Sequence, residues 1–303
     1  MKKIVVTGAT SMIGVALIEK AVANKVEVLA MVNKNSTRTE RLPKSDLVTI
    51  AFCDLNDVGS VSFEEKEYDS FYHFAWKGTD KGGRNNPLVQ AENITSTIEM
   101  VKLAKRLGCK RFIGAGSQAE YGQVAGVISP DTITNPQTAY GIAKLTSGKL
   151  AELMCRQLDI EFVWGRIFSV YGCLDNEGTM VNYAIDRFLL KEEARFSSAM
   201  NYWNYLNEKD AGEAFFLLGK CENVSRVYCI ANNESKILRE YIQTIADCFG
   251  TEAKCCFSES STGTNLIADI SKLEKDTGFI PRVGFREGIS SVIEFRRKGL
   301  ERK

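Results

Sequence analysis

The sequence contains little histidine and little proline: one histidine and 5 prolines stand among 303 residues. Its charges nearly cancel, because 39 lysines and arginines are balanced by 38 acidic residues and leave a formal net charge of +1. No apolar run reaches the roughly 20 residues that a membrane-spanning helix needs. These shortages argue against a basic nucleic-acid-binding surface, a membrane span and a histidine-rich metal centre. We therefore expect no nucleic-acid, membrane or metal partner.

The nine cysteines are scattered along the chain and contain no C-x-x-C pair. Such spacing indicates reduced thiols of an intracellular protein and not a disulfide framework. The chain begins MKKIVVTG, whose short apolar run lacks a small-residue cleavage site. We interpret this start as a first strand and expect a cytoplasmic protein.

Strand-like and helical patterns alternate along the first half of the chain. Apolar, β-rich runs predict strands, and segments with apolar residues at helical spacing predict helices. The expected strands are 2–8, 26–32, 47–54, 68–76, 110–117 and 160–172, and the expected helices are 12–23, 88–107 and 138–157. This alternation predicts an α/β fold with a doubly wound parallel sheet, which binds ligands at the carboxyl ends of its strands.

The stretch VVTGATSMIG, residues 5–14, joins the first expected strand to the first expected helix. Gly8 and Gly14 have the spacing of the first and last glycines of a dinucleotide-binding turn, where backbone N–H groups hold a pyrophosphate. Ser11 stands where the middle glycine is usual. Its Cβ costs little if its φ angle is not positive, and its hydroxyl can hydrogen-bond a phosphate oxygen. A turn of purely structural use is the alternative, but the strand-to-helix context favours a Rossmann-type cofactor site.

The residues after the second expected strand help to distinguish NAD(H) from NADP(H) as the cofactor. An acidic side chain there would bind the ribose hydroxyls of NAD, but Asn33 occupies the position. Basic and hydroxyl side chains follow it: Lys34, Ser36, Arg38 and Arg41. They suit a 2′-phosphate and favour NADP(H), with NAD(H) still possible; a solvated basic loop is the alternative. Asp54 closes the third strand and either accepts from the adenine amino group or caps the next turn.

Tyr140 and Lys144 lie four residues apart and therefore share one face of the expected helix 138–157. An ammonium group near a phenol favours the phenolate and lowers a pKa that is ordinarily about 10, which makes the tyrosine a usable proton shuttle. Tyr205 and Lys209 have the same spacing, but no serine at a strand end precedes them. Ser117 precedes Tyr140 at the end of the strand 110–117, where it can hydrogen-bond a substrate oxygen.

Taken together, these motifs resemble the extended short-chain dehydrogenase/reductases, also called the NAD-dependent epimerase/dehydratase family. The resemblance runs through nearly the whole chain. It rests on TGATSMIG, CDL, YHFAW, Asn93 in AENITST, GAGSQAEYG, YGIAK, GRIFSVYG and WNYLNEKDAGEA. The stretch SQAEYG together with the last of these motifs also looks like nucleotide-sugar 4-keto-hexose reductases.

The resemblance implies a catalytic triad of Ser117, Tyr140 and Lys144. It implies a cofactor site made of Gly8, Ser11, Met12, Ile13, Gly14, Asn33, Lys34, Arg38, Asp54, Leu55, Phe74, Ala75, Tyr140, Lys144 and Phe168. A nucleotide-diphosphate sugar would contact Ser117, Ser169 and Arg195, with Arg239, Arg282 and Arg286 as further candidates for its diphosphate. Asp210 falls where relatives start a helix, so we expect a structural role for it.

The resemblance also implies a division of the chain. Residues 1–166 are expected to form the dinucleotide-binding domain, to which a segment near 203–231 returns. Residues 167–202 and 232–303 are expected to form a smaller C-terminal α/β substrate-binding part. Family members often dimerise through two helices, here 88–107 and 138–157, although their apolar faces can equally be used up on their own sheet.

The reaction can be narrowed from the residues near Ser117. Gln118 and Ala119 stand where dehydratases carry an acid/base pair, which disfavours dehydration. His73, the lone histidine, lies beside the cofactor stretch, which disfavours epimerisation next to a keto group by a cysteine/histidine pair. We expect an NADP(H)-dependent reductase of a 4-keto-6-deoxy sugar nucleotide with Tyr140 as acid/base. The alternatives are an NAD-dependent nucleotide-sugar 4-epimerase and a non-catalytic dinucleotide-binding sensor.

Overall fold

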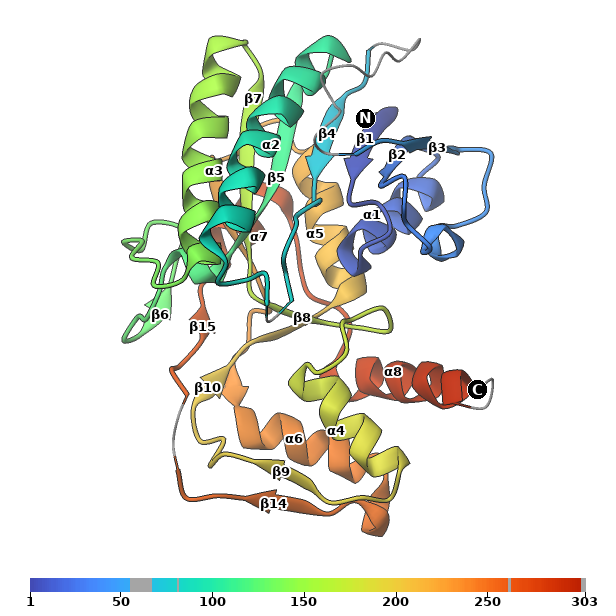
Figure 1. Ribbon diagram of the computed structural model, residues 1–303, viewed down its shortest axis with the longest axis vertical. Helices are drawn as coiled ribbons and strands as arrows, with labels where there is room; N and C mark the ends of the chain where they lie inside the picture. The colour runs from blue at the N-terminus through green and yellow to red at the C-terminus, as the bar shows by residue number, and fades with distance from the viewer. Residues whose placement is uncertain (55–66, 81, 261–262, 301–303) are drawn as a thin grey trace.

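A parallel sheet covered by helices on both faces forms the larger part of the protein in the computed structural model, which describes residues 1–54, 67–80, 82–260 and 263–300 (Figure 1). The strands, in sheet order, are β12 (Val227–Ile230), β7 (Glu161–Ile167), β5 (Arg111–Ser117), β4 (Ser70–His73), β1 (Lys3–Thr7), β2 (Glu27–Val32) and β3 (Val48–Phe52). All neighbouring pairs run parallel. The expected α/β class with a doubly wound sheet is confirmed.

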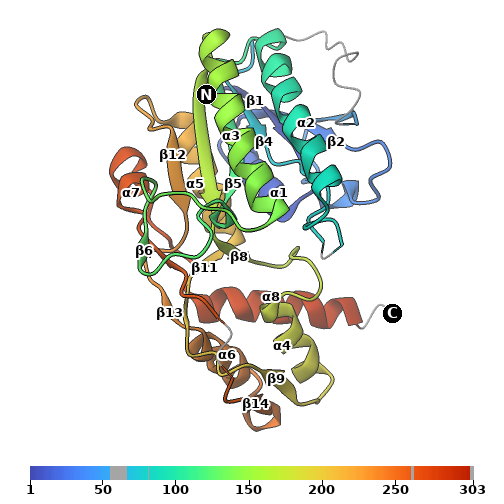
Figure 2. The same cartoon turned by 60° about the vertical axis from the view of Figure 1, so that its left-hand side comes forward.

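The two faces of the sheet are buried under different helices. In β1, Ile4 and Val6 join the core that contains α1 (Met12–Ala23) and α5 (Glu208–Lys220). Val5 points the other way, into the core formed with α2 (Pro87–Arg106) and α3 (Ala139–Gln157). Successive side chains of a strand alternate between faces, so burial on both sides requires a continuous apolar run such as IVV. Figure 2 shows α2 and α3 lying together along the sheet.

The order of the strands places a crevice at the carboxyl end of the sheet. From β1 the chain proceeds outward through β2 and β3, and it then returns to β4, on the other side of β1, before continuing to β5 and β7. Ligands bind doubly wound sheets at such a switch point. Gly8 follows β1, Phe74 follows β4, Ser117 ends β5 and Phe168 follows β7, so four expected site residues meet at this edge.

The expected strand 160–172 is two strands in the structure. β7 ends at Ile167, the backbone N–H of Phe168 donates to the carbonyl of Ile230 at 3.0 Å, and β8 (Ser169–Tyr171) pairs with β11 (Tyr205–Asn207) in a separate sheet. The apolar pattern runs through both strands because both are buried on at least one side, so periodicity does not mark the break.

Three further helices form a second, smaller part, in the lower half of Figure 1. Its core includes side chains of α4 (Met180–Leu189), α6 (Leu238–Asp247) and α8 (Phe285–Leu300). Its short strands pair as β9 (Ala194–Phe196) with β14 (Cys255–Phe257) and β10 (Tyr202–Trp203) with β13 (Lys236–Ile237). The other elements are β6 (Val127–Ile128), paired with β15 (Ile267–Ala268), α7 (Ser271–Thr277), and the 3-10 turns η1 (Thr39–Arg41), η3 (Gln118–Glu120) and η4 (Gly250–Glu252).

Segments distant in sequence complete the sheet. α5 packs against α1, and β12 adds the strand beside β7, so residues 205–230 lie with the N-terminal half of the chain. Among the described helices, none combines the length and the apolar character needed to cross a bilayer.

Candidate active site

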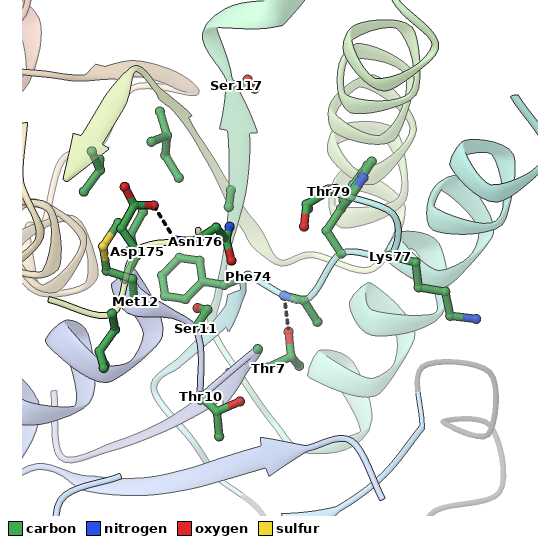
Figure 3. Close-up of a pocket in the computed structure, with 18 of the residues that line it drawn as sticks. Thr7, Thr10, Ser11, Met12, Phe74, Lys77, Thr79, Ser117, Asp175 and Asn176 are labelled. Atoms are coloured by element: carbon green, nitrogen blue, oxygen red, sulfur yellow. Dashed lines mark hydrogen bonds between the residues drawn. The ribbon is translucent and has the colours of Figure 1, made fainter. Parts of the chain in front are cut away.

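A cavity of about 780 Å³ lies at the carboxyl ends of the strands, between the sheet and the smaller part. Its lining includes Ser11 of the glycine turn and Ser117 at the end of β5, and it continues to Asp175, Thr179 and Trp203. Figure 3 shows Ser11, Met12 and Phe74 close to Asp175 and Asn176, which follow β8. Both parts of the chain therefore contribute to one site.

The glycine turn has the geometry of a pyrophosphate cradle. Gly8 has a φ of +65°, and a Cβ there would lie 2.6 Å from the backbone nitrogen of Ala75. At Gly14 a Cβ would lie 2.4 Å from the carbonyl oxygen of Gly8, so both glycines are required by packing. Ser11 has a φ of −73°, so its Cβ brings no strain.

The Ser11 hydroxyl caps the first helix. It accepts the backbone N–H of Gly14 at 3.1 Å, which makes Ser11 the N-cap of α1. Its own hydrogen stays available for an oxygen in the cavity. Ser11, Met12 and Ile13 line the cavity at the helix N-terminus, where partial positive charge favours an anion. The turn, although it has Ser11 in place of the middle glycine, can therefore still hold the pyrophosphate of a dinucleotide.

The end of the cavity beside β2, where the sequence analysis expects the adenosine of a dinucleotide and which we call the adenosine end, is basic. Arg38, Arg41 and Ser36 line it together with Asn33, whose Nδ2 donates to the Asp54 carboxylate at 3.2 Å. The pKa of Arg41 is lowered, chiefly by burial and then by the charge of Arg38, so the two guanidinium groups are close enough to repel each other. Lys34 does not line the cavity. Leu55, also expected here, falls outside the described residues.

Ser117 and Tyr140 meet on one wall of the cavity. The Ser117 hydroxyl accepts the backbone N–H of Ala119 at 3.2 Å, as the N-cap of η3. Burial raises the pKa of the Tyr140 phenol, while the charge of Arg84 and the nearby Ser117 hydroxyl oppose that rise. An oxygen held between the two hydroxyl groups would be polarised by one and exchange a proton with the other.

Lys144 is buried and faces a different partner from the one expected. Its ammonium donates to the carbonyl of Ala115 at 2.7 Å and lies 3.6 Å from the centre of the Trp76 ring. It is 5.8 Å from the centre of the Tyr140 ring. Burial lowers the pKa of Lys144 to about 7. That Lys144 acts on Tyr140 stays a prediction; in this structure the nearer cation is Arg84, whose guanidinium carbon lies 4.1 Å from the ring centre.

Other residues that the sequence analysis assigns to the cofactor also line the cavity. Phe74, Ala75 and Phe168 line the cavity, and the Ala75 N–H donates to the Thr7 hydroxyl at 3.4 Å (Figure 3). Ser169 also lines it, at the start of β8.

The arginines expected at the substrate diphosphate lie elsewhere. Arg195 has a side chain that is 79% exposed and pairs with Glu193 at 2.8 Å, so it is not part of the cavity. Arg239 stacks on Phe257 at 4.2 Å, and Arg286 pairs with Asp247 at 3.1 Å. Arg282 does not line the cavity either. A short strand such as β9 gives no sequence signal of which way its side chains face, which is why the expectation failed for Arg195.

The side chains of His73 and Asp210 hydrogen-bond to neighbouring elements of the fold. The His73 ring lies between the hydroxyls of Thr7, at 2.8 Å, and Thr97, at 3.3 Å, and burial lowers its pKa to about 3, so it stays neutral. Asp210, in the first turn of α5, accepts the backbone N–H groups of Arg282 and Val283 at 3.1 and 2.9 Å. Among the residues that the structure describes, no cluster of histidine, cysteine and acidic side chains is arranged to hold a metal ion.

Two features of the site escaped the sequence analysis. Glu120, one residue beyond the positions considered for acid/base chemistry, turns inward and is fully buried behind Ser117. Trp76 and Arg84, from the segment between β4 and α2, line the cavity beside Tyr140. The capping-box spacing of Ser117 and Glu120 was a local signal for the first feature. No local sequence pattern predicts that Trp76 and Arg84 lie beside Tyr140, because their position depends on how this segment packs on α3.

Known proteins share this architecture. The model of the NAD dependent epimerase/dehydratase family matches residues 4–231. The chain is 24% identical over 209 residues to the uncharacterized UDP-glucose epimerase YtcB of Bacillus subtilis, covering 68% of this chain and 66% of that protein. It is 24% identical over 317 residues to UDP-glucuronic acid decarboxylase 1 of Arabidopsis thaliana, covering 98% of this chain and 71% of the relative.

A solved structure extends the likeness to the whole fold. UDP-glucuronic acid 4-epimerase from Bacillus cereus, in complex with NAD, matches with a TM-score of 0.84 at 19% identity, covering 99% of this chain and 98% of that chain. At this identity the likeness concerns the fold alone, whereas the family model covers most of the sequence. The resemblance stated from the motifs is confirmed: this chain belongs to the NAD-dependent epimerase/dehydratase family, the extended short-chain dehydrogenase/reductase enzymes.

Proposed function

We propose that this protein is a nucleotide-sugar 4-epimerase, which inverts C4 of a sugar carried on a nucleoside diphosphate. The observation that carries the proposal is that the Ser117 hydroxyl and the Tyr140 phenol line one cavity together with the glycine turn. The name of the Bacillus cereus structure, a UDP-glucuronic acid 4-epimerase, supports C4 as the reacting centre, and the name of the Bacillus subtilis relative, a UDP-glucose epimerase, supports epimerisation. They favour epimerisation over the reductase that the sequence analysis put first.

The residues present fit a nicotinamide dinucleotide. The turn at Gly8 and Gly14 leaves no room for a Cβ, and the N-terminus of α1 faces the same cavity. We propose that Ser11, Met12 and Ile13 hold its pyrophosphate and that Phe74, Ala75 and Phe168 flank its inner half. When bound, this group supplies the acceptor and donor of hydride.

The chain's own residues would then handle the protons. The Tyr140 phenolate takes the proton of the C4 hydroxyl as that carbon is oxidised, and it returns the proton when the carbon is reduced on its other face. The Ser117 hydroxyl donates to the C4 oxygen and stabilises the keto group. Inversion requires the sugar to turn within the cavity, and the extension of the cavity to Thr179 and Trp203 offers the space.

A reductase that uses NADPH is the second candidate, and one observation favours it. Arg38 and Arg41 both line the adenosine end, where Asn33 replaces an acidic residue. Two guanidinium groups there suit the 2′-phosphate of a cofactor that binds and leaves with each turnover. The same catalytic pair would serve, with Tyr140 protonating the oxygen that forms from a 4-keto group.

One experiment separates the candidates. The purified protein is dialysed, assayed for retained NAD, and incubated with a panel of UDP-hexoses and UDP-hexuronic acids whose C4 configuration is read by NMR. A parallel set contains NADPH and 4-keto-6-deoxy sugar nucleotides, with NADPH loss followed by absorbance. Interconversion of C4 epimers with retained NAD supports the epimerase, and NADPH loss without epimerisation supports the reductase.

The variant Tyr140→Phe is the matched control, because it keeps the ring and removes only the hydroxyl. It should bind the cofactor as the wild type does and lose at least about 100-fold in turnover. A protein that turns over no substrate of either panel would instead favour the sensor, and the epimerase proposal would fall.

A further inference from the structure

Arg84 contacts Tyr140 with both its main chain and its side chain. Its guanidinium carbon lies 4.1 Å from the centre of the Tyr140 ring, within the roughly 6 Å over which a cation is attracted to an aromatic face. Its carbonyl oxygen accepts the backbone N–H of Tyr140 at 3.1 Å. One residue of the segment between β4 and α2 thus holds the tyrosine from two directions.

The segment that carries Arg84 is held in place by its own hydrogen bonds. The Asp80 carboxylate accepts the N–H of Gly83 at 2.7 Å, and the Asp80 carbonyl accepts the N–H of Arg84 at 3.0 Å. The buried amide of Gln90 donates to the carbonyls of Gly78 and Gly83 at 2.9 and 3.0 Å. A Cβ at Gly83 would lie 2.4 Å from the Cα of Gly78, so the turn closes on itself. The backbone at Arg84 is therefore held by hydrogen bonds on both sides of the turn.

The other groups around Tyr140 leave Arg84 as its main cation. Lys144 lies 5.8 Å from the ring centre and donates to a backbone carbonyl instead. Glu120 opposes the phenolate, but its carboxylate is paired with Arg166. Ser117 is neutral, although its hydroxyl also favours the phenolate. No ion pair of Arg84 with a carboxylate occurs within the described ranges, so its charge is directed mainly at the ring.

We propose that Arg84 is a positioning residue for Tyr140, which covers one face of the ring and stabilises the phenolate. A phenolate ring carries more negative charge than a phenol ring, so a guanidinium against its face favours the deprotonated form. Arg84 thereby offsets the burial of the phenol, a task that the sequence motif assigns to Lys144. This inference rests on the proposed use of Tyr140 as acid/base.

The test is a titration of Tyr140 in the substrate-free protein. Phenolate absorbance is recorded against pH, and the curve of the same protein with Tyr140→Phe is subtracted, which isolates one tyrosine. In Arg84→Gln, and in the second neutral variant Arg84→Met, the midpoint should rise by about one pH unit or more, a tenfold loss of phenolate at a given pH. In Arg84→Lys, which keeps the charge, most of the shift should be absent.

Lys77→Gln is the matched control, because Lys77 lies in the same loop and pairs with Glu92 at 3.2 Å. Its titration curve should coincide with that of the wild type. Equal midpoints in the wild type and the folded neutral variants would overturn the proposal. Equal shifts in Arg84→Gln and Arg84→Lys would also overturn it, because shape and not charge would then be responsible. The titration needs no substrate, so it stands whether or not epimerisation is found.

Discussion

The Arg166 guanidinium donates to the Glu120 carboxylate at 2.7 Å, and both side chains are buried directly behind Ser117. The second carboxylate oxygen accepts the backbone N–H of Ser117 at 2.8 Å and the indole N–H of Trp164 at 2.9 Å. One carboxylate therefore joins the backbone at Ser117 to Trp164 and Arg166. The pair sets the direction in which the serine hydroxyl enters the cavity.

Breaking the Glu120–Arg166 pair should lower the free energy of unfolding by much more than breaking a surface ion pair does. Glu120→Gln keeps an oxygen for Ser117 and Trp164 but leaves Arg166 as a buried, unpaired charge, so we expect a loss of about 3–5 kcal/mol in the free energy of unfolding. Urea denaturation followed by circular dichroism measures it. The control is Arg226→Gln, which removes an exposed pair with Glu152 and should cost less than about 1 kcal/mol. Similar losses in the two variants would refute the role given to burial.

The buried ammonium of Lys144 should lower the free energy of unfolding, by an amount that depends on pH. Its pKa is lowered to about 7 in the folded protein because burial disfavours the charged ammonium. The penalty is complete below about pH 7 and disappears as the pH rises toward the ordinary lysine pKa of about 10.4. In cofactor-free protein, Lys144→Met should therefore raise the free energy of unfolding at pH 6 by about 1–3 kcal/mol, after subtraction of the lost bond to Ala115.

The measurement is thermal or urea unfolding at several pH values between 6 and 10. The gain of Lys144→Met over the wild type should shrink steadily with rising pH. Lys149→Met, an exposed position of the same helix, is the control and should change stability little at any pH. A gain that stays constant with pH would contradict the titration of Lys144.

The arginines at the adenosine end should decide between the two cofactors. If Arg38 and Arg41 bind a 2′-phosphate, Arg38→Ala and Arg41→Ala should each weaken NADPH binding about 10- to 100-fold and leave NADH binding nearly unchanged, because a bond to a charged group contributes about 1.5–3 kcal/mol. Fluorescence titration with both cofactors measures this. Lys34→Ala is the control, since that residue does not line the cavity. Equal losses for the two cofactors would remove the argument for NADP(H).

The exposed apolar side chains of α3 lead us to predict a dimer contact through this helix. Ile142, Leu150 and Leu153 are 51, 38 and 47% exposed along this helix. We expect them to pack against a second copy of the chain, so Ile142→Arg and Leu153→Arg should shift the protein from dimer to monomer in sedimentation analysis. Ile133→Arg, at an 86% exposed position outside the helices, should leave the mass unchanged. A wild type that is monomeric at micromolar concentration would refute this assignment.

The sequence by itself determined the features that depend on neighbours along the chain. Apolar runs buried on both faces gave the parallel strands, and residues at a spacing of 3 or 4 gave the helices on either side. Gly8 and Gly14 marked the turn because only glycine has room there, and Tyr140 and Lys144 fell on one helix face because of helical periodicity alone. These patterns involve residues that are close along the chain, so a single sequence is sufficient to detect them.

Only the tertiary structure decided which distant side chains meet. It placed Arg84 against Tyr140, directed Lys144 to Ala115, and buried Glu120 against Arg166, contacts that join separate elements. It also turned Arg195 to solvent, although its charge had suited a diphosphate. The physical reason is that the charge a group experiences depends on burial and on neighbours brought together by packing, and the order of residues along the chain encodes neither of these locally.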